Sequence, residues 1–533
     1  MTGAAPPHDS LPAPSVGHLV RQAAARFGTR DLLRFGEVRL SFEQVERRTN
    51  QLANVLRAQG VSRGDRVALM LPNGVDFPLA WLAIAKAGAV MVPLNVQYRA
   101  HDLAYTLGNS GTSVVLADPA FAPLLREVAP ALPALRALVD VPAGAADGRG
   151  ESAIAADVRA ARTDLDLGDI GPADLLNIQY TSGTTGAPKG CMLSHEYWLR
   201  LAERSVRFSG VGEDDVALTA QPFYYMDPQW NVGMALVAGC SLVILPRFSA
   251  STFWQTVKET GTTFFYVLGT MPVYLLKQPP DPEVERGHRV RYVACSGIVP
   301  QLHAEFEARW GVPWREAFGM TETGVDLFVP VEDATCVGSG AAGRPVDGKE
   351  ARVVDVDGRP LGDDAVGELC VRGTGMMLGY WNNPGATAER IRDGWLHTGD
   401  LAYRDAKGYY HIVGRLKDMI RRTGENISAV EVEGVLAQHP AVRGAAVVPV
   451  ADELRGEEVK AFIQLQPGCE GTDPSAIVDF AREQLAAFKV PRFIEYVDDL
   501  PRTPSEKVAK HELLARTSDQ RRGAWDATTG TWG

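Results

Sequence analysis

The alternation of short apolar runs with longer amphipathic segments constrains the fold of the chain up to Gly340 more than any other feature. The runs RVALMLP (66–72), VMVPLN (90–95) and TSVVLAD (112–118) are short and rich in β-branched residues, as buried strands are. The segments between them, such as SFEQVERRTNQLANVLRAQG (41–60), have helical spacing and end at glycine. Strands that alternate with helices predict parallel α/β layers.

Other parts of the chain have a different texture. Residues 1–14 are rich in Pro, Gly and Ala and predict disorder, whereas residues 15–27 show helical spacing. Residues 141–166, rich in Ala, Gly and Asp, predict a surface excursion. Beyond Gly340, short runs such as GELCVRG and GYYHIVG with frequent turn signals predict antiparallel strands. The last part carries strands and helices enough for a small α+β domain, with a boundary at 414–418.

Composition excludes several functional classes. A chain of 533 residues exceeds one ordinary core, and its net charge of −11 argues against general nucleic-acid binding. Its six cysteines form no CxxC pair, so neither a zinc knuckle nor a disulfide framework is indicated. No signal peptide is evident, and the apolar stretch 79–94 is interrupted by Lys86 and too short to cross a membrane. We therefore expect a cytoplasmic protein without an integral membrane segment, and a buried helix running into a strand at 79–94.

The segment YTSGTTGAPKG (180–190) is the strongest single indication of function. It follows an apolar run, LLNIQ, and its glycines allow a tight turn that presents several N–H groups to one anion. Its spacing differs from the common P-loop, and a solvent-exposed polar loop would have a similar composition. Clustered hydroxyl and amine groups directly after a strand favour a polyphosphate site. The residues concerned are Thr181, Ser182, Gly183, Thr184, Thr185, Gly186 and Lys189.

This segment resembles the phosphate-binding loop of the adenylate-forming superfamily, which includes acyl- and aryl-CoA synthetases, peptide-synthetase adenylation domains and luciferases. Four further segments follow in the order of that family: FGMTETG (318–324), GWLHTGD (394–400), GYYHIVGRLKDMIRRTGENISAVEVE (408–433) and PRTPSEK (501–507). The resemblance covers nearly the whole chain, and within the superfamily it is strongest to carnitine/crotonobetaine-type and aryl-CoA ligases.

The resemblance implies a fold and a reaction. The fold is α/β: a large multi-subdomain N-terminal α/β domain (1–414) with a distorted β-barrel part, a hinge at 415–418, and a small mobile α+β C-terminal domain (419–533) whose tail after about 515 is flexible. The reaction is activation of a carboxylic acid by ATP to an acyl-AMP with release of pyrophosphate, followed by transfer to the thiol of coenzyme A. ATP, Mg²⁺ and coenzyme A are the implied cofactors, and the chain would act as a monomer or homodimer.

The resemblance also assigns residues to the ATP half of the site. Glu322 and Thr181 would hold Mg²⁺, the usual partner of ATP phosphates. Asp400 offers two acceptor oxygens to the ribose hydroxyls. Lys507 would reach the α-phosphate, although Glu506 stands before it where the family usually has Gly. The catalytic set is Lys507, Glu322, Thr321 and Thr181; the nucleotide set adds the loop residues named above, Ser296, Gly297, Phe318, Gly319, Met320, Asp400 and Arg415.

Three further assignments concern the second half-reaction. In the resembling enzymes the C-terminal domain rotates between the two steps, and Lys417 aligns with the pivot of that motion. The segment 423–427 would then line the tunnel for the pantetheine thiol. For coenzyme A we therefore expect contacts from Gly424, Glu425 and Lys489.

The acid pocket is expected near PFYYMDPQW (222–230), YVLGT (266–270) and CSGI (295–298). Its aromatic character suits a flat or cationic substrate. Asp227 is either a turn or capping residue before Pro228 or a partner for an amino, hydroxyl or ammonium group of the substrate. The expected pocket residues are Tyr224, Tyr225, Asp227, Trp230, Tyr266, Gly297, Met320 and Val325.

Two other functions remain open at this stage. The same adenylation chemistry serves other acceptors, such as a carrier-protein thiol, an amine or nitrite, as in ATP-dependent diazotases. A catalytically inactive nucleotide-binding protein is the second alternative. The complete set Thr321, Glu322, Asp400, Arg415 and Lys507 argues against the inactive protein.

Overall fold

The computed structural model describes residues 10–145, 148–149, 152–181, 188–269, 271–423, 425–452, 454–502, 508–517 and 519–533. Packing divides the chain into two compact units. The first unit comprises Met1–Ala351 and Val371–Leu396, and the second comprises Arg352–Cys370 and His397–Gly533. The hinge predicted at 415–418 concerns a motion between two states and stays a prediction, as does the distorted barrel part.

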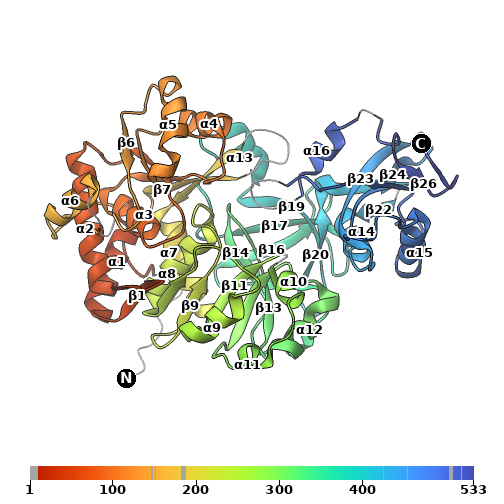
Figure 1. The fold of residues 1–533 in the computed structure, drawn as a ribbon, viewed down its shortest axis with the longest axis horizontal. Helices are drawn as coiled ribbons and strands as arrows, with labels where there is room; N and C mark the ends of the chain where they lie inside the picture. The colour runs from red at the N-terminus through yellow and green to blue at the C-terminus, as the bar shows by residue number, and fades with distance from the viewer. Residues whose placement is uncertain are drawn as a thin grey trace. The chain divides into compact units, whose positions relative to one another are not determined.

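The first sheet of the first unit has the parallel α/β architecture that the alternation predicts (Figure 1). Its strand order is β6-β5-β3-β4-β7-β8, and each neighbouring pair is parallel except the terminal β7–β8 pair. Apolar side chains on its strands pack against α4 and α5. The bounds are β3 (Arg66–Met70), β4 (Val90–Pro93), β5 (Val114–Ala117), β6 (Ala137–Asp140), β7 (Leu175–Thr181), β8 (Lys189–Ser194), α4 (Ala100–Ser110), η1 (Pro119–Phe121), α5 (Ala122–Val128), η2 (Ala129–Ala131) and α6 (Ala153–Ala160).

Helices α1 (Val16–Phe27), α2 (Phe42–Ala58) and α3 (Asp76–Ala87) pack on one another in the first unit. Ser15 caps α1, and Ser41 forms a capping box with Gln44 at the start of α2. Such caps satisfy N–H groups that a helix leaves unpaired, so the predicted helix starts are local properties of the sequence.

The apolar stretch 79–94 is a buried helix followed by a strand, as predicted. Lys86, which interrupts it, is fully buried; its Nζ contacts the Glu46 carboxylate and lies 2.8 Å from Asn50 Oδ1. Burial lowers the pKa of Lys86 to about 8, and the Glu46 charge opposes that shift. A buried ammonium is tolerated because it is paired and hydrogen-bonded.

The second sheet of the first unit carries the strands that lead into the candidate site. Within this unit its order is β15-β14-β13-β12-β11-β9-β10-β1-β2, with the run from β13 to β1 parallel. Aromatic side chains such as Phe306, Trp310 and Trp314 fill the core beside it. The bounds are β1 (Asp31–Phe35), β2 (Val38–Ser41), β9 (Val216–Thr219), β10 (Ser241–Ile244), β11 (Phe264–Leu268), β12 (Tyr292–Ser296), β13 (Trp314–Met320), β14 (Gly324–Phe328), β15 (Ala341–Pro345), α7 (His195–Ser209), α8 (Met226–Ala238), α9 (Phe253–Thr260), α10 (Met271–Leu276), α11 (Pro282–Glu285), α12 (Pro300–Trp310) and η3 (Ala334–Cys336).

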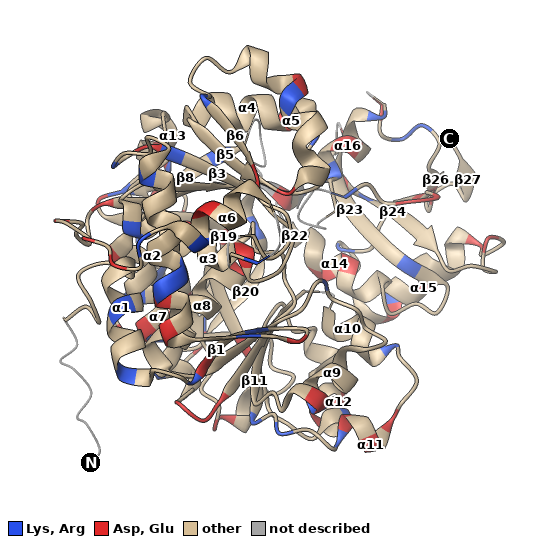
Figure 2. Cartoon of the chain, turned by 60° about the vertical axis from the view of Figure 1, so that its left-hand side comes forward, with Lys and Arg blue, Asp and Glu red and all other residues tan. Residues whose placement is uncertain are grey.

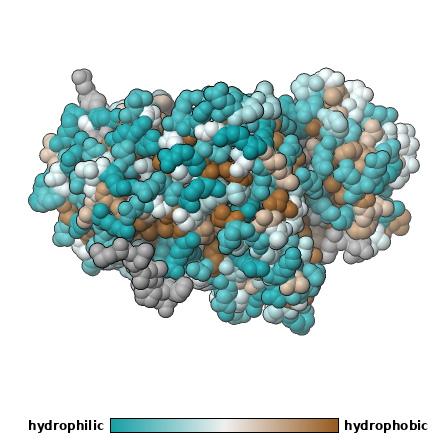
Figure 3. All heavy atoms as spheres, turned by 90° about the horizontal axis from the view of Figure 1, so that it is seen from below, coloured by the Kyte–Doolittle hydropathy of each residue, from teal (hydrophilic) through white to brown (hydrophobic). Residues whose placement is uncertain are grey.

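The surface carries charges of both signs. Along α7, Lys/Arg and Asp/Glu positions lie close together, and Arg207 pairs with Glu203 at 2.8 Å (Figure 2). On the face in Figure 3, hydrophilic residues predominate, with smaller hydrophobic areas among them. Within the described residues, no helix combines the length and hydropathy that a membrane span needs.

Antiparallel strands follow Gly340, as the turn signals predict. In the second unit β19 pairs with β20 in antiparallel register. The remaining bounds in this part of the chain are β16 (Lys349–Val354), β17 (Gly367–Gly373), α13 (Pro384–Arg390), β18 (Ile391–Arg392), β19 (Trp395–Arg404), β20 (Tyr410–Arg415) and η4 (Leu416–Asp418).

The C-terminal lobe, defined here as the described residues from Met419 onward, is an α+β layer structure. Alternate residues of its central strands face different cores: Val447 packs with α14 and α15, whereas Ala446 and Val448 pack with Leu513 of α16. This period of two is the signature of a sheet covered on both faces. The bounds are β21 (Met419–Arg422), β22 (Glu425–Ser428), α14 (Ala429–Leu436), β23 (Val442–Asp452), β24 (Gly456–Leu465), α15 (Pro474–Gln484), β25 (Phe493–Tyr496), α16 (Lys510–Ala515), β26 (Trp525–Asp526) and β27 (Thr531–Trp532).

The two ends of the chain bear on the sequence-based expectations of disorder. Of the segment 1–14, the structure describes residues 10–14, and Ala13 is buried. In the tail after about 515, β26 pairs with β25, and β27 pairs with β26. Trp525 belongs to the core of the C-terminal lobe, so this part of the tail is packed on the lobe.

The buried His195 predicts an acid-sensitive contact between α1 and α7. Its Nδ1 accepts a hydrogen bond from Val16 N at 3.2 Å, and burial lowers its pKa to about 4. Between pH 6.5 and 4 the unfolded chain binds a proton there and the folded chain does not, so stability falls as pH falls through this window. We expect His195→Asn, which keeps an acceptor and does not titrate, to reduce this loss by up to about 3 kcal/mol. Chemical denaturation at pH 7 and pH 4 measures the difference, and an equal loss in both proteins contradicts the assignment.

Candidate active site

The predicted phosphate loop is the tip of the β7–β8 hairpin. Tyr180 pairs with Gly190 and Thr181 pairs with Lys189 across the hairpin. Gly190 is required there, because a Cβ would lie 2.5 Å from Ile178 Cγ2. The strand residues on either side of the loop are thereby paired with each other at the edge of a sheet. Ser182, Gly183, Thr184, Thr185 and Gly186 lie outside the described residues.

A tyrosine links the end of this loop to Glu322. The Tyr380 hydroxyl donates a hydrogen bond to Glu322 Oε1 at 2.8 Å, and Lys189 Nζ lies 5.4 Å from the centre of the Tyr380 ring. Arg390 Nη2 lies 4.0 Å from the same carboxylate oxygen. Glu322 is 7% exposed, so little solvent reaches its carboxylate. Lys189 and Glu322, far apart in sequence, are thus brought together around one aromatic ring.

Sequence reasoning missed Tyr380 and Arg390. Both lie between the segments that carried the family resemblance. The available signal was the aromatic pair Tyr380–Trp381 in a turn-rich stretch before Pro384. The same neighbourhood includes the buried Cys191, whose thiol pKa is raised by burial and by the Glu322 charge.

The segment FGMTETG forms the turn between β13 and β14. Gly319 has no room for a side chain, because a Cβ would lie 2.1 Å from Gly324 O. Tyr197 OH donates to Thr321 O at 3.0 Å. Thr321 and Glu322 are therefore presented by a turn whose backbone is fixed from both sides. Phe318, Met320 and Val325 flank this turn on the two strands.

A buried ion pair between Lys349 and Asp326 supports the turn between β13 and β14. Lys349 Nζ lies 3.4 Å from Asp326 Oδ1 and donates to Thr323 O at 2.6 Å. Thr323 Oγ1 also donates to the Asp326 carboxylate. Burial lowers the pKa of Lys349 to about 8 and raises that of Asp326, as expected when charged forms lose water.

The residues of the expected acid pocket make both polar and aromatic contacts with one another. The Tyr266 hydroxyl and Ser296 Oγ are 2.7 Å apart, and the rings of Trp230 and Tyr266 lie edge to face at 5.6 Å. Glu316 accepts hydrogen bonds from Gly297 N and from the next backbone N–H, both at 2.7 Å. Burial raises the pKa of Glu316 to about 8. The turn of Ser296 and Gly297 is thereby tied to β13.

Asp227 lies in the first turn of α8, after Tyr225 at the N-cap. Its backbone oxygen accepts a hydrogen bond from Asn231 Nδ2 at 2.6 Å. Burial first, and then charges that include that of Asp227, hold the pKa of Tyr197 and of Tyr266 well above the usual range. The Asp227 charge therefore acts on the two tyrosines whose hydroxyls contact Thr321 and Ser296. Tyr224, which is buried, stacks edge to face on Tyr225 at 4.7 Å.

In the second unit, two predicted nucleotide ligands, Asp400 and Arg415, are cross-strand partners. Asp400 on β19 pairs with Arg415 on β20, and Arg415 Nε lies 2.6 Å from Asp400 Oδ1. The part of β19 directly before Asp400 is held by Glu368, which accepts from Gly399 N at 3.0 Å and is hydrogen-bonded to His397 Nδ1 at 2.7 Å. Asp400 is 4% exposed, so it is a fixed acceptor beside a fixed cation.

The candidate coenzyme A residues are described only in part. Gly424 and the predicted catalytic Lys507 lie outside the described residues. Glu425 begins β22 and Lys417 lies in η4, with only their backbones described. Lys489 Nζ lies 2.6 Å from Glu431 Oε1, so this lysine forms an ion pair within the lobe.

Comparison with known proteins identifies the family of this chain. Residues 20–381 match the AMP-binding enzyme family, and residues 431–507 match the AMP-binding enzyme C-terminal domain. The chain belongs to the AMP-binding enzyme family. It is 34% identical over 487 residues to the crotonobetaine/carnitine–CoA ligase of Escherichia coli O157:H7, which covers 89% of this chain and 93% of the relative.

Solved structures agree with this family and fold. ATP-bound MatB from Rhodopseudomonas palustris superposes with a TM-score of 0.85 at 29% identity, covering 94% of this chain and 98% of MatB. The anthranilate CoA ligase AuaEII in complex with anthranoyl-AMP gives a TM-score of 0.86 at 27% identity, covering 95% and 98%. The predicted α/β fold with a large N-terminal and a small C-terminal domain is confirmed. The chain is an AMP-forming acid–thiol ligase, which adenylates a carboxylic acid and transfers it to coenzyme A.

The hydrogen bond from Tyr380 to Glu322 predicts a loss of adenylation in Tyr380→Phe. A hydrogen bond to a charged group contributes more than a neutral one, and its loss leaves the ligase's Glu322 carboxylate misaligned. We expect acid-dependent ATP–pyrophosphate exchange to fall on the order of tenfold, with a higher Mg²⁺ requirement. Tyr496→Phe, which removes a hydroxyl bonded to Thr472 O in the C-terminal lobe, is the matched control. Equal exchange rates in the two variants would exclude this role for Tyr380.

Proposed function

We propose that this ligase activates a carboxylic acid that bears an amino, hydroxyl or ammonium group. The observations that carry the proposal are that the Asp227 charge helps to raise the pKa values of Tyr197 and Tyr266, and that the ring of Trp230 lies against that of Tyr266. A carboxylate near aromatic rings suits a cationic or hydrogen-donating substituent. Two named relatives support this class. One is a crotonobetaine/carnitine–CoA ligase, and the other is solved with anthranoyl-AMP. The acids in both names carry nitrogen.

In the proposed first step, an oxygen of the acid attacks the α-phosphorus of ATP. A bond forms between that oxygen and phosphorus, and the bond to the leaving pyrophosphate breaks. The backbone N–H groups of the loop after Thr181, together with Lys189, would screen the phosphates. Asp400 and Arg415 would hold the ribose, and Lys507 would bridge the acid and the α-phosphate.

The donor set at Glu322 fits Mg²⁺. Glu322 offers a carboxylate oxygen and Thr181 a hydroxyl, and hard oxygen ligands are those that Mg²⁺ prefers. Burial and the Glu322 charge raise the pKa of the Cys191 thiol, so this thiol is a poor competing ligand for the ion. Bound there, Mg²⁺ would neutralise charge on the phosphates. Tyr380, by donating to Glu322 Oε1, would leave the other carboxylate oxygen available to the ion.

In the proposed second step, the thiol of coenzyme A attacks the carbonyl carbon of the acyl-AMP. The carbon–sulfur bond forms, AMP departs with the electron pair of the carbon–oxygen bond, and the thiol proton is released. The segment 423–427 and the loop at Lys489 would guide the thiol after the C-terminal domain rotates about Lys417. Lys489 would have to leave Glu431, with which it pairs in this structure, to contact a phosphate of coenzyme A.

A panel of acids tests the proposed function. With ATP and Mg²⁺ we expect amino-, hydroxyl- or ammonium-substituted acids to release pyrophosphate faster than their unsubstituted analogues, and coenzyme A to yield the thioester by mass spectrometry. Lys507→Ala should slow adenylation on the order of 100-fold, because it removes a charge contact of the transition state. Lys407→Ala, at an exposed turn, is the matched control.

The outcomes separate the alternatives. An acyl-AMP that reacts with a carrier protein, an amine or nitrite, and not with coenzyme A, would show that the acceptor is different. Absence of ATP–pyrophosphate exchange with every acid would instead favour an inactive nucleotide-binding protein.

Asp227 predicts the substrate preference. For Asp227→Asn we expect kcat/KM for the polar-substituted acid to fall on the order of 10- to 100-fold, as for loss of a charged hydrogen-bond partner. The value for the unsubstituted analogue should change little, because that acid offers Asp227 nothing to bind. A uniform loss for both acids, or a lower Tm with unchanged preference, would show that Asp227 serves only the start of α8.

A further inference from the structure

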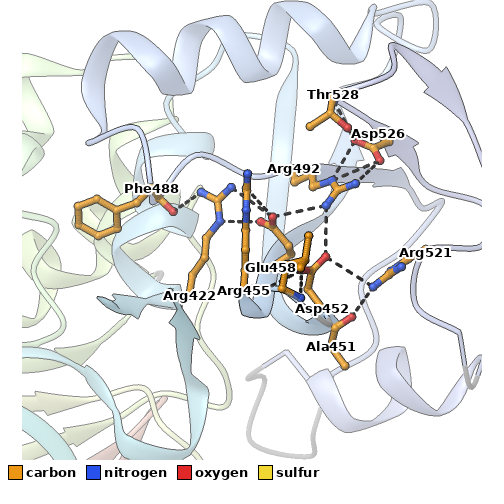
Figure 4. Close-up of polar contacts among 11 residues, drawn as sticks. Arg422, Ala451, Asp452, Arg455, Glu458, Phe488, Arg492, Arg521, Asp526 and Thr528 are labelled. Carbon is orange, nitrogen blue, oxygen red and sulfur yellow. Dashed lines mark hydrogen bonds and ion pairs between the residues drawn. The ribbon is translucent and has the colours of Figure 1, made fainter. Parts of the chain in front are cut away.

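A carboxylate with no exposed surface lies at the centre of the ion pairs of the C-terminal lobe (Figure 4). It belongs to Glu458 near the start of β24. Arg422, the last residue of β21, approaches it as a fork, with Nε 2.7 Å from Oε2 and Nη2 3.3 Å from Oε1. Arg455 Nη1 lies 2.7 Å from Oε1. Because a buried carboxylate is costly unless it is paired and hydrogen-bonded, both guanidinium groups are fixed on it.

The two arginines also carry contacts to the loops around them. Arg422 Nη1 donates to Phe488 O at 2.8 Å, which fixes the peptide bond that precedes Lys489. The backbone oxygen of Arg455 accepts from Thr423 N at 2.8 Å. Glu458 thus determines, through Arg422 and Arg455, where two separate backbone segments lie.

A third arginine connects this cluster to the end of the chain. Arg492 Nη1 lies 3.5 Å from Glu458 Oε1 and 3.3 Å from Asp452 Oδ2. Its Nη2 lies 3.0 Å from Oδ2 of Asp526, the second residue of β26 (Figure 4). We call Arg422, Arg455, Glu458 and Arg492 the Glu458 network.

The tip of the β21–β22 hairpin has a backbone conformation that needs such support. Thr423 has a φ of 54°, in the left-handed region that a β-branched residue rarely adopts. Strained residues of this kind persist only where the surrounding structure over-determines them. Here the support is the hydrogen bond from Thr423 N and the ladder pairing of Arg422 with Gly456.

We propose that Glu458 is a positioning residue for transfer of the acyl group to the thiol. The proposal rests on the proposed function, which places the thiol tunnel at 423–427 and a coenzyme A contact at the loop of Lys489. Glu458 acts through Arg422 and Arg455, which hold both of these segments. The first half-reaction uses neither segment in the proposed mechanism, so the effect of Glu458 is confined to the second.

A matched control is the ion pair between Lys460 of the same strand and Glu495 of β25. Lys460 of β24 is fully buried and its Nζ lies 2.6 Å from Glu495 Oε2, and it donates to Gln520 O at 2.6 Å. This pair ties β24 to β25 and to the segment before β26, rather than to the β21–β22 hairpin. Glu495→Gln therefore removes a carboxylate charge from a buried lysine of the same lobe, as Glu458→Gln removes one from the arginines that it pairs with.

The experiment compares the two variants in each half-reaction. For Glu458→Gln we expect KM for coenzyme A to rise about tenfold, while ATP–pyrophosphate exchange stays within about twofold of the wild type. For Glu495→Gln we expect a lower Tm and an unchanged KM for coenzyme A. A conservative variant, Glu458→Asp, should recover part of the affinity for coenzyme A because it keeps the charge.

Each other outcome rejects the proposal in a recognisable way. An unchanged KM for coenzyme A in folded Glu458→Gln, an equal loss in both half-reactions, or the same change in Glu495→Gln would overturn it. If Glu458→Gln does not fold, Arg455→Gln replaces it, because that side chain is 44% exposed and its backbone bond to Thr423 remains. Failure of the wild type to form a coenzyme A thioester would instead overturn the proposed function.

Discussion

Carboxylates that folding has wholly or largely removed from water hold loops of this ligase. A buried carboxylate must find hydrogen-bond donors, since leaving it unpaired costs several kcal/mol. Many of the donors here belong to segments that carry site residues. The hydrogen bonds that offset the loss of water therefore also hold these segments in place. Glu316 binds Gly297 N, Glu322 binds Tyr380, Asp326 binds Lys349 and Thr323, Glu368 binds Gly399 N, and Glu458 binds Arg422 and Arg455.

These anchors are found in both compact units. In the first unit they fix the turn that presents Thr321 and Glu322 and the turn at Ser296. In the second unit they fix the approach to Asp400 and the tip of the β21–β22 hairpin. Strands supply the rigid stems, and the anchored turns supply the chemistry, which is the common arrangement of catalytic residues on loops.

Much of the fold is local information and was predictable. The runs at 66–72, 90–95 and 112–118 are strands, the segment 41–60 is a capped helix, and the apolar stretch with Lys86 is a helix followed by a strand. Periodicity and caps act within a few residues, so they survive in the sequence. The residues named through the family resemblance include several that the structure brings together, such as Lys189 with Glu322 and Asp400 with Arg415. Lys507 and the centre of the phosphate loop stay predictions.

The sequence by itself determined the layers, the order of the segments and the family. It gave no indication of the buried partners, because most of them pair residues that are far apart in the chain. Tyr380 meets Glu322 across 58 residues, and Arg422 meets Glu458 across 36. A charged residue reads as solvated surface in a one-dimensional pattern, and only packing decides whether water is excluded from it. The tertiary structure determines whether a charged side chain is desolvated, because desolvation depends on which strands and helices pack over it.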